Sequence, residues 1–416
     1  MRYIFFLGRI PALSLAEIQA MLEKYDLKYK IVLTSESFAI LDLEEKLDVR
    51  DFFVQMGGTP KIAEVLAETD EEGVREMAAG LIKKAFEEKP GKKDIGYSIY
   101  FTKKYTKDKE EEKMKFYQDI FSKMKRDELK ERSVRIVYPN PGETELSTAT
   151  VFNNRLAKAK NFEFDIIYAG KKLILGKTVI VQDIESYGMR DYEKPGRDAH
   201  IGMMPPKLAQ IMINLARPKE GQLIFDPFCG TGTILQEALL NDYRVIGSDA
   251  NGEQIEKCKK NLEWLGKKYV LTYPEYKVFQ ASFNEAIKKL KPGYVDAIVT
   301  ESTLGPVYKK VPSPTEIKGN YATLNKLYTR FLQNIRPVLK TGGRIVVTLP
   351  AYQLKPKEYV FAEFIDSLEK LGYSRVCPLD KRFESESIRI TRRGTIIYSR
   401  PEQIVAREIV IFQKNR

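Results

Sequence analysis

The sequence contains little of the chemistry on which many enzymes depend. Among 416 residues there is one histidine, His200, and the three cysteines, Cys229, Cys258 and Cys377, lie far apart. This scarcity excludes zinc sites of the usual spacings, a disulfide framework and any Ser-His-Asp hydrolase that does not use His200 itself. We therefore expect no metal centre.

Long apolar runs are also missing. No stretch approaches the roughly 18–20 residues that a membrane helix needs, and the N-terminal segment lacks the apolar length and cleavage site of a signal peptide. Charge, in contrast, is abundant: 69 Lys and Arg face 57 Asp and Glu, a net charge of +12 with a pI of about 9.2. These features predict a basic cytoplasmic protein, without membrane attachment, whose partner is a polyanion.

The first half of the chain predicts two small units. Residues 1–65 read as a short α/β unit, in which Ser14 and Glu17 have the spacing of a helix-capping box. Residues 66–185 follow as a second unit with aromatic strands and a charge-dense helix. From residue 91 to 160, 17 Lys and Arg face 11 Asp and Glu, so half of the excess positive charge lies there. This concentration favours nucleic-acid docking over the alternative, a solvated helix face.

The second half predicts a larger domain. Residues 186–200 combine glycine, proline and charge without periodicity and are predicted to be a linker. From 201 to 416, apolar strands alternate with amphipathic helices, which is typical of a doubly wound α/β domain with a seven-stranded sheet. The pair of strands Thr395–Tyr398 and Glu408–Phe412 is expected to complete this sheet. Arg392, Arg393 and Arg400 precede the last of these strands and are expected on the rim of the site.

One glycine-rich turn has the features of a cofactor site. The apolar strand Leu223–Phe225 ends in Asp226, the turn Pro-Phe-Cys-Gly-Thr-Gly follows, and an apolar helix begins at Thr233. Glycines at such a turn let a ligand approach the backbone at the carboxyl edge of the sheet. A second strand ends in Asp249, where an acid can accept hydrogen bonds from ribose hydroxyls.

The acid at the turn distinguishes between cofactors. A nicotinamide fingerprint is G-x-G-x-x-G without a leading acid, whereas Asp226 here precedes the glycines. A carboxylate at this position would repel a pyrophosphate but suits the ammonium group of an amino-acid cofactor. The turn therefore predicts S-adenosylmethionine.

The motif D-P-F-C-G-T-G-T resembles motif I of class I S-adenosylmethionine methyltransferases, in the branch that modifies RNA guanosine on N2. Residues 202–216 are similar to the helix that precedes motif I in that branch. The first 185 residues resemble its ferredoxin-like plus THUMP pair, which holds tRNA by the acceptor end. The resemblance implies a seven-stranded, Rossmann-like methyltransferase domain and the tRNA guanosine-N2 methyltransferase family that acts near position 10.

The resemblance also implies the cofactor's neighbours. Asp226, Gly230 and Gly232 would line the methionine end, and Asp249 the ribose. The family often supplies an acid to the adenine amino group after the third strand, where this chain has Gln280 or Ser282 instead. The full set of expected cofactor-binding residues is Met204, Pro205, Asp226, Phe228, Cys229, Gly230, Thr231, Gly232, Thr233, Asp249, Ala250, Ser282 and Glu301.

The expected catalytic strand departs from the family pattern. After Tyr294–Thr300 the family has D-P-P-Y, whose acid accepts the protons of an exocyclic amine and whose aromatic stacks the flipped base. This chain has Glu301-Ser302-Thr303-Leu304-Gly305-Pro306. In one interpretation Glu301 accepts the protons with the Ser302 carbonyl, and Tyr308 stacks the base. In the other, the site uses a different acceptor or is inactive.

The leading hypothesis is methyl transfer to N2 of a tRNA guanosine. The alternatives are an amino-methyltransferase on ribosomal RNA or DNA, and an RNA-binding relative without catalysis. A small activating subunit is a further possible partner.

Overall fold

The computed structural model describes residues 1–415 except 89–90, 103–104, 128, 131, 159, 171, 198–202, 307, 356–357 and 401–402. His200 and part of the predicted linker therefore lie outside the described residues. The chain divides into two compact units. The first comprises residues 1–11, 27–54 and 59–186, and the second comprises 12–26, 55–58 and 187–416. No helix of the described chain is long and apolar enough to span a bilayer.

The first unit is built on one eight-stranded sheet in the order β2-β3-β1-β4-β8-β7-β5-β6. Its strands are β1 (Arg2–Phe6), β2 (Tyr29–Thr34), β3 (Phe38–Leu43), β4 (Lys61–Thr69), β5 (Lys93–Phe101), β6 (Val134–Val137), β7 (Phe162–Ala169) and β8 (Lys172–Val181). Its helices are α2 (Val49–Val54), α3 (Glu71–Glu88), α4 (Lys107–Asp127) and α5 (Thr148–Asn153). Thus both predicted N-terminal units share a single sheet.

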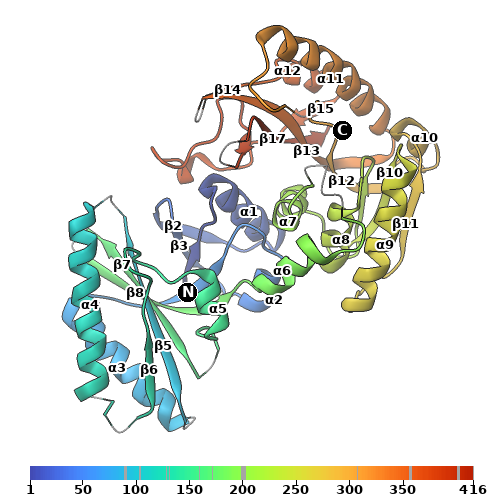
Figure 1. Cartoon of the computed structure of the whole chain (residues 1–416). Helices are drawn as coiled ribbons and strands as arrows, with labels where there is room; N and C mark the ends of the chain where they lie inside the picture. Colours follow the sequence, from blue (N-terminus) through green and yellow to red (C-terminus); the bar gives the residue numbers. More distant parts are fainter. Residues whose placement is uncertain are drawn as a thin grey trace. The chain divides into compact units, whose positions relative to one another are not determined.

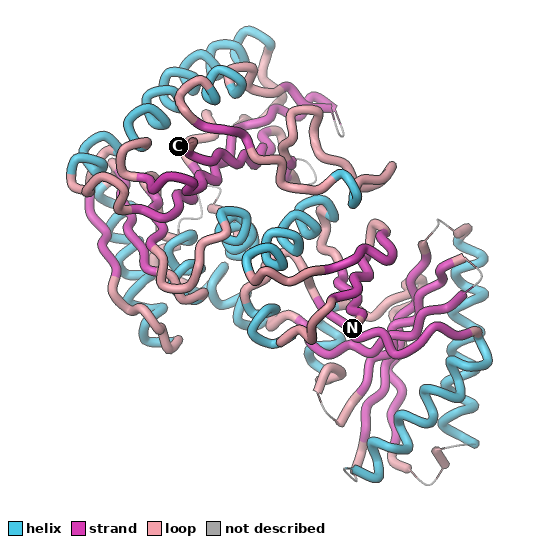
Figure 2. Tube along the Cα trace, turned by 180° about the vertical axis from the view of Figure 1, so that it is seen from behind, coloured by secondary structure: helices cyan, strands magenta, loops and turns pink. Residues whose placement is uncertain are grey.

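Helices α3 and α4 cover one face of that sheet, as Figures 1 and 2 show from opposite sides. They bury a core that includes Val74, Ile82, Tyr97 and Phe121, and Tyr97 stacks on Phe121 with ring centroids 4.6 Å apart. Because α4 buries only three residues, its remaining charged face stays in solvent.

The second unit is built on a second sheet, most of whose strands are parallel. Its main sheet runs β11-β10-β9-β12-β13-β17-β15, with β14 and β16 as short additions. Its strands are β9 (Leu223–Asp226), β10 (Arg244–Asp249), β11 (Tyr276–Gln280), β12 (Val295–Glu301), β13 (Leu339–Lys355), β14 (Glu358–Val360), β15 (Tyr373–Arg375), β16 (Ile396–Tyr398) and β17 (Val405–Lys414). The first five strands of the path are parallel, and β17 enters antiparallel between β13 and β15. The predicted seven-stranded fold is confirmed.

Helices cover both faces of this sheet (Figure 1). On one face, α10 (Phe283–Lys288), α11 (Pro314–Ile335) and α12 (Ile365–Glu369) bury Phe225, Ile298 and Phe331 in a common core. On the other lie α7 (Pro206–Ala216), α8 (Thr233–Leu240) and α9 (Gly252–Lys268). Two short helical turns, α6 (Ile184–Gly188) and the π-helix η1 (Met189–Glu193), precede α7, and a 3-10 turn η2 (Lys381–Phe383) follows β15.

Helix α1 (Pro11–Lys24) belongs to the second unit from Ala12 onward. The helix begins at Pro11, so the prediction that Ser14 caps it is wrong. Proline has no N–H to satisfy and its fixed φ suits the first helical turn. Ser14 instead donates a buried hydrogen bond to the Gly58 carbonyl (2.7 Å), and Glu17 accepts from the backbone N–H groups of Gly57 (2.8 Å) and Gly58 (2.7 Å).

Candidate active site

The turn after β9 is fastened to the end of the neighbouring strand β10. Cys229 N–H donates to the Ser248 carbonyl (2.9 Å), and Gly230 N–H donates to Asp249 Oδ2 (3.0 Å). Asp249 Oδ1 accepts from the Asn251 N–H (2.9 Å). The turn therefore has a fixed shape before any ligand arrives, which reduces the ordering cost of binding.

Two glycines of the turn have positive φ, for different reasons. At Gly232 (φ +85°) a Cβ would lie 2.5 Å from Cys258 Sγ, so the backbone packs directly on that thiol. At Gly230 (φ +50°) a Cβ would meet no atom within 4 Å. Gly230 also lines a cavity beside the turn, so its missing side chain leaves room for a ligand.

Asp226 is buried at the carboxyl end of β9. Its Oδ1 accepts from Thr300 Oγ1 (2.6 Å) and from the Phe228 N–H (3.1 Å). Burial raises the pKa of this carboxyl to about 7, although both hydrogen bonds oppose the shift. An acid with this pKa at a cavity wall can become an anion when a cation binds beside it.

The cysteines near the turn are packing groups. Cys229 and Cys258 are buried, and a hydrogen bond with Cys258, together with burial, raises the pKa of the Cys229 thiol. The Cys229 thiol therefore stays protonated at neutral pH, which does not suit a nucleophile.

One cavity of about 880 Å³ connects the turn with the predicted catalytic strand. Eleven of the predicted site residues line it: Met204, Asp226, Phe228, Cys229, Gly230, Thr231, Thr233, Asp249, Glu301, Ser302 and Tyr308. Four others do not contribute to the lining in the described chain: Pro205, Gly232, Ala250 and Ser282. Ser282 caps α10 by exchanging hydrogen bonds with Glu285, and the amide of Gln280 donates to the Ala250 carbonyl (3.1 Å).

Glu301 ends β12 and is held by two neighbours. Arg407 of β17 donates twice, from Nε to Oε2 (2.5 Å) and from Nη2 to Oε1 (2.8 Å). Thr348 Oγ1 of β13 donates to Oε2 (3.1 Å). We call Arg407 and Thr348 the Glu301 clamp. Arg407 also lines the cavity.

Tyr308 is the aromatic residue on the other side of the motif. Its hydroxyl accepts from the Asn320 side-chain amide, and its ring lies edge-on to Tyr352, with centroids 6.0 Å apart. The ring is thus supported from two sides while it lines the cavity. A flat group in this position can stack a nucleobase.

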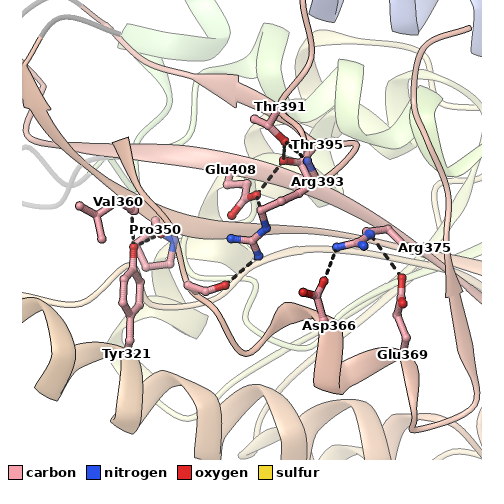
Figure 3. Close-up of polar contacts among 11 residues, drawn as sticks. Tyr321, Pro350, Val360, Asp366, Glu369, Arg375, Thr391, Arg393, Thr395 and Glu408 are labelled. Atoms are coloured by element: carbon pink, nitrogen blue, oxygen red, sulfur yellow. Dashed lines mark hydrogen bonds and ion pairs between the residues drawn. The ribbon is translucent and has the colours of Figure 1, made fainter. Parts of the chain in front are cut away.

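Besides Arg407 of β17, two basic side chains of the described chain line the cavity, each from a loop. Lys309 and Arg400 line it, and both are exposed. Arg393 does not have the predicted place on the rim. It donates to the Ala362 carbonyl (2.7 Å) and lies 3.7 Å from the buried carboxylate of Glu408 (Figure 3). Adjacent residues of a strand point to opposite faces, so Arg407 and Glu408 serve different sides of the sheet.

The predicted linker contributes buried groups just before the site. Arg190 of η1 pairs with Glu237 of α8 (2.7 Å), and Lys194 Nζ donates to Thr233 Oγ1 (2.9 Å). Gly196 N–H donates to Asn261 Oδ1 (2.7 Å). These contacts fix the start of α8, so the described part of the segment is an ordered support of the turn between β9 and α8.

Sequence reasoning missed Arg407 and the lining segment Gln403–Val405. The predicted last strand began at Glu408, whereas β17 begins at Val405. A signal was present, because an arginine at the start of a buried apolar strand requires an anionic partner.

Comparison with known proteins agrees with this arrangement. Residues 194–360 match the family model of an RMKL-like methyltransferase domain, and residues 69–260 match a DNA methylase model. The solved structure of TrmN from Thermus thermophilus resembles the whole chain with a TM-score of 0.52 at 13% identity, covering 100% of both chains. At this identity the likeness concerns the fold.

Curated relatives are more specific. The tRNA (guanine(10)-N2)-dimethyltransferase of Methanothermobacter thermautotrophicus is 35% identical over 36% of this chain and 40% of its own. The protein of the same name from Methanocaldococcus jannaschii is 33% identical over 43% of this chain and 48% of its own. The chain thus spans less than half the length of these two relatives.

A third relative is covered more fully. The probable tRNA (guanine(10)-N2)-dimethyltransferase of Methanothermococcus thermolithotrophicus is 33% identical over 34% of this chain and 77% of its own. With this coverage and the class I topology, the chain belongs to the tRNA guanosine-N2 methyltransferase family of the guanosine-10 type.

Proposed function

We propose that this protein transfers a methyl group from S-adenosylmethionine to the exocyclic N2 of a guanosine in tRNA, near position 10. One observation carries the proposal: a single cavity is lined by the Asp226–Thr233 turn and by Glu301 and Ser302. The cofactor's methyl donor and the acceptor's amine must meet in one such space. Family membership supports the substrate class.

In this proposal the turn holds the cofactor. Asp226 faces the ammonium group of the methionine moiety, Gly230 leaves room for it, and Asp249 accepts from the ribose. S-adenosylmethionine would supply an activated methyl group on a sulfonium. The other predicted cofactor residues, including Met204, Phe228 and Thr231, would complete the wall.

Glu301 and Ser302, at the end of β12, would position the amine. S-adenosylmethionine, when bound, would supply the methyl group to the N2 lone pair and would leave as a neutral thioether. Glu301 and the Ser302 carbonyl accept the N–H groups and stabilise the charge that develops on nitrogen, before its proton leaves to solvent. Tyr308 would stack the flipped base, with Lys309 and Arg400 beside its phosphate.

The first unit would bind tRNA. We propose residues 1–65 as the ferredoxin-like part, 66–185 as the THUMP-like part, 186–200 as the linker and 201–416 as the methyltransferase domain. The charged, exposed face of α4 and the excess positive charge from 91 to 160 support RNA docking through phosphates. A cytoplasmic location and a small activating subunit belong to the same proposal.

Transfer of labelled methyl to unmodified tRNA, followed by nucleoside mass spectrometry, tests the proposal. We expect N2-methylguanosine from the wild-type chain and its loss in Glu301→Ala, with cofactor binding retained in calorimetry. Transfer only to ribosomal RNA or DNA would replace the substrate, and cofactor binding without any transfer would favour an RNA-binding relative. Failure to bind the cofactor would contradict the enzyme assignment.

A further inference from the structure

The Glu301 clamp is more elaborate than a simple proton acceptor requires. Glutamate stands where the resembling motif has aspartate, so its carboxylate is on a side chain one methylene longer. Each added rotatable bond gives the carboxylate more positions to occupy, and a reactive geometry admits few of them. A device that orients the longer side chain is therefore expected.

Arg407 has the geometry of such a device. Its guanidinium donates two hydrogen bonds to the two different oxygens of Glu301, at 2.5 and 2.8 Å. This bidentate arrangement fixes the plane of a carboxylate as well as its position. The Arg407 and Glu301 side chains are 7% and 17% exposed, so the pair is shielded from water.

The clamp also determines which part of the carboxylate remains available. Thr348 Oγ1 donates to Oε2, the oxygen that already accepts from Arg407 Nε. A carboxylate has about four acceptor sites, and donors from the described residues occupy two on Oε2 and one on Oε1. The remaining capacity is on Oε1, in a residue that lines the cavity.

We propose that Arg407 is a positioning residue, which holds Glu301 so that Oε1 accepts the N–H of the target amine. This inference rests on the proposed function and deepens it. Arg407 of β17 is 106 residues from Glu301 in the sequence. The inference gives this distant strand a part in orienting the acceptor.

Kinetics of five variants test the inference: Arg407→Gln, Arg407→Lys, Glu301→Gln, the double variant Arg407→Gln/Glu301→Gln, and Arg393→Gln as a matched control. Arg393 is also a guanidinium beside a buried carboxylate, that of Glu408 on β17 (Figure 3). Glu408 points to the opposite face of the sheet from its neighbour Arg407. For each, kcat, the KM for tRNA, the cofactor Kd from calorimetry and the unfolding temperature are measured.

We expect Arg407→Gln to lower kcat by about tenfold to a hundredfold, as loss of positioning does, while the KM and the cofactor Kd change less than about threefold. Arg407→Lys should recover part of kcat. In the Glu301→Gln background, adding Arg407→Gln should not lower kcat further. Arg407 acts through the Glu301 carboxylate, so its effect is lost once that carboxylate is gone. Arg393→Gln should keep kcat at temperatures below its unfolding transition.

Three results would overturn the inference alone: an unchanged kcat in Arg407→Gln, a full additional loss in the double variant, or an equal loss of kcat in Arg393→Gln. A wild-type chain that binds the cofactor but methylates no guanosine would refute the proposed function, and the inference with it.

Discussion

Asp226 is the residue whose ionisation most directly concerns the proposed cofactor. Burial raises its pKa to about 7, so in the empty site it is largely protonated below neutral pH. A cationic ammonium group binds the anion, and the proton must leave before the contact forms. Cofactor affinity therefore rises with pH until the carboxyl is ionised.

We predict that the Kd for S-adenosylmethionine increases about tenfold for each pH unit below 7 and levels off above pH 8. Asp226→Asn should bind about 10- to 100-fold more weakly at pH 8, as loss of a charged hydrogen bond does, with little pH dependence. Calorimetry between pH 5.5 and 8.5 gives both curves. Parallel curves for the two proteins would show that Asp226 does not control binding.

Glu17 is a second buried acid, remote from the cavity. It accepts from the N–H groups of Gly57 and Gly58 and from the Asn214 side-chain amide (2.8 Å). Burial nevertheless raises its pKa from 4.5 to about 7. The folded state thus binds a proton between pH 4.5 and 7 that the unfolded state has released, so stability falls as pH rises through this window.

This shift corresponds to about 3 kcal/mol of unfolding free energy lost between pH 4.5 and 7. Glu17→Gln is expected to be less stable overall, because its amide group faces N–H donors, but to lack this part of the pH dependence. Urea unfolding at pH 5 and pH 8 measures the difference, and the single tryptophan, Trp264 in α9, reports on the second unit. Equal pH slopes in both proteins would rule out Glu17 as the titrating group.

At the scale of the element, the turn between β9 and α8 separates two roles of glycine. A methyl group at Gly232 would collide with Cys258 Sγ, whereas at Gly230 it would point into open space. Both residues have positive φ, so alanine at either position costs about 1 kcal/mol in backbone strain.

We therefore predict that Gly230→Ala lowers stability by only about 1 kcal/mol but greatly weakens cofactor binding, because its Cβ occupies the cavity. Gly232→Ala should lose roughly 2–4 kcal/mol, since overpacking adds to the strain. Thermal unfolding and calorimetry on both variants separate the effects. The contrast fails if Gly230→Ala is the less stable of the two or binds the cofactor normally.

The same turn shows what a sequence can predict. An apolar strand, an acid and spaced glycines are contiguous, so local patterning located the glycine-rich turn that lines the cavity, and the α/β alternation predicted the sheet. The clamp on Glu301 was not predictable in this way. Arg407 reaches Glu301 past the strand β13, and the register of the antiparallel β17 is set by tertiary pairing between residues such as Pro350 and Arg407.

Ser14 and Glu17 illustrate a contact that the sequence predicted wrongly. Their spacing is that of a capping box, yet both side chains are buried and bind the 57–58 backbone. The two side chains do form hydrogen bonds with backbone groups, as a capping box does, but these groups belong to a loop about 40 residues away in the sequence. Spacing alone cannot distinguish a helix cap from a tertiary contact made by the same residue types.

At the scale of the molecule, the second unit is not a continuous stretch of chain. Residues 12–26 and 55–58 belong to it together with 187–416. Helix α1 is connected to it by Glu17 with Asn214, by Lys24 Nζ donating to the Tyr243 hydroxyl (2.7 Å), and by Gln19 accepting from the Asp380 N–H (2.8 Å). The apolar face of α1, including Leu15, Ile18 and Leu22, is fully buried.

We predict that a chain limited to residues 187–416 is unstable, because it lacks helix α1, which is part of its core. Without α1, Asn214 loses its hydrogen bond to Glu17 and Tyr243 loses its hydrogen bond from Lys24. Burying three such apolar side chains contributes on the order of 5 kcal/mol, comparable to the whole stability of many domains. The fragment should unfold at a markedly lower temperature than the intact protein and bind the cofactor weakly.

The matched control is the production of residues 1–186 together with residues 187–416 as separate chains. This should restore the unfolding temperature and cofactor binding, because α1 is then present again. A fragment 187–416 that unfolds at the temperature of the full chain would show that α1 is dispensable for the stability of the second unit.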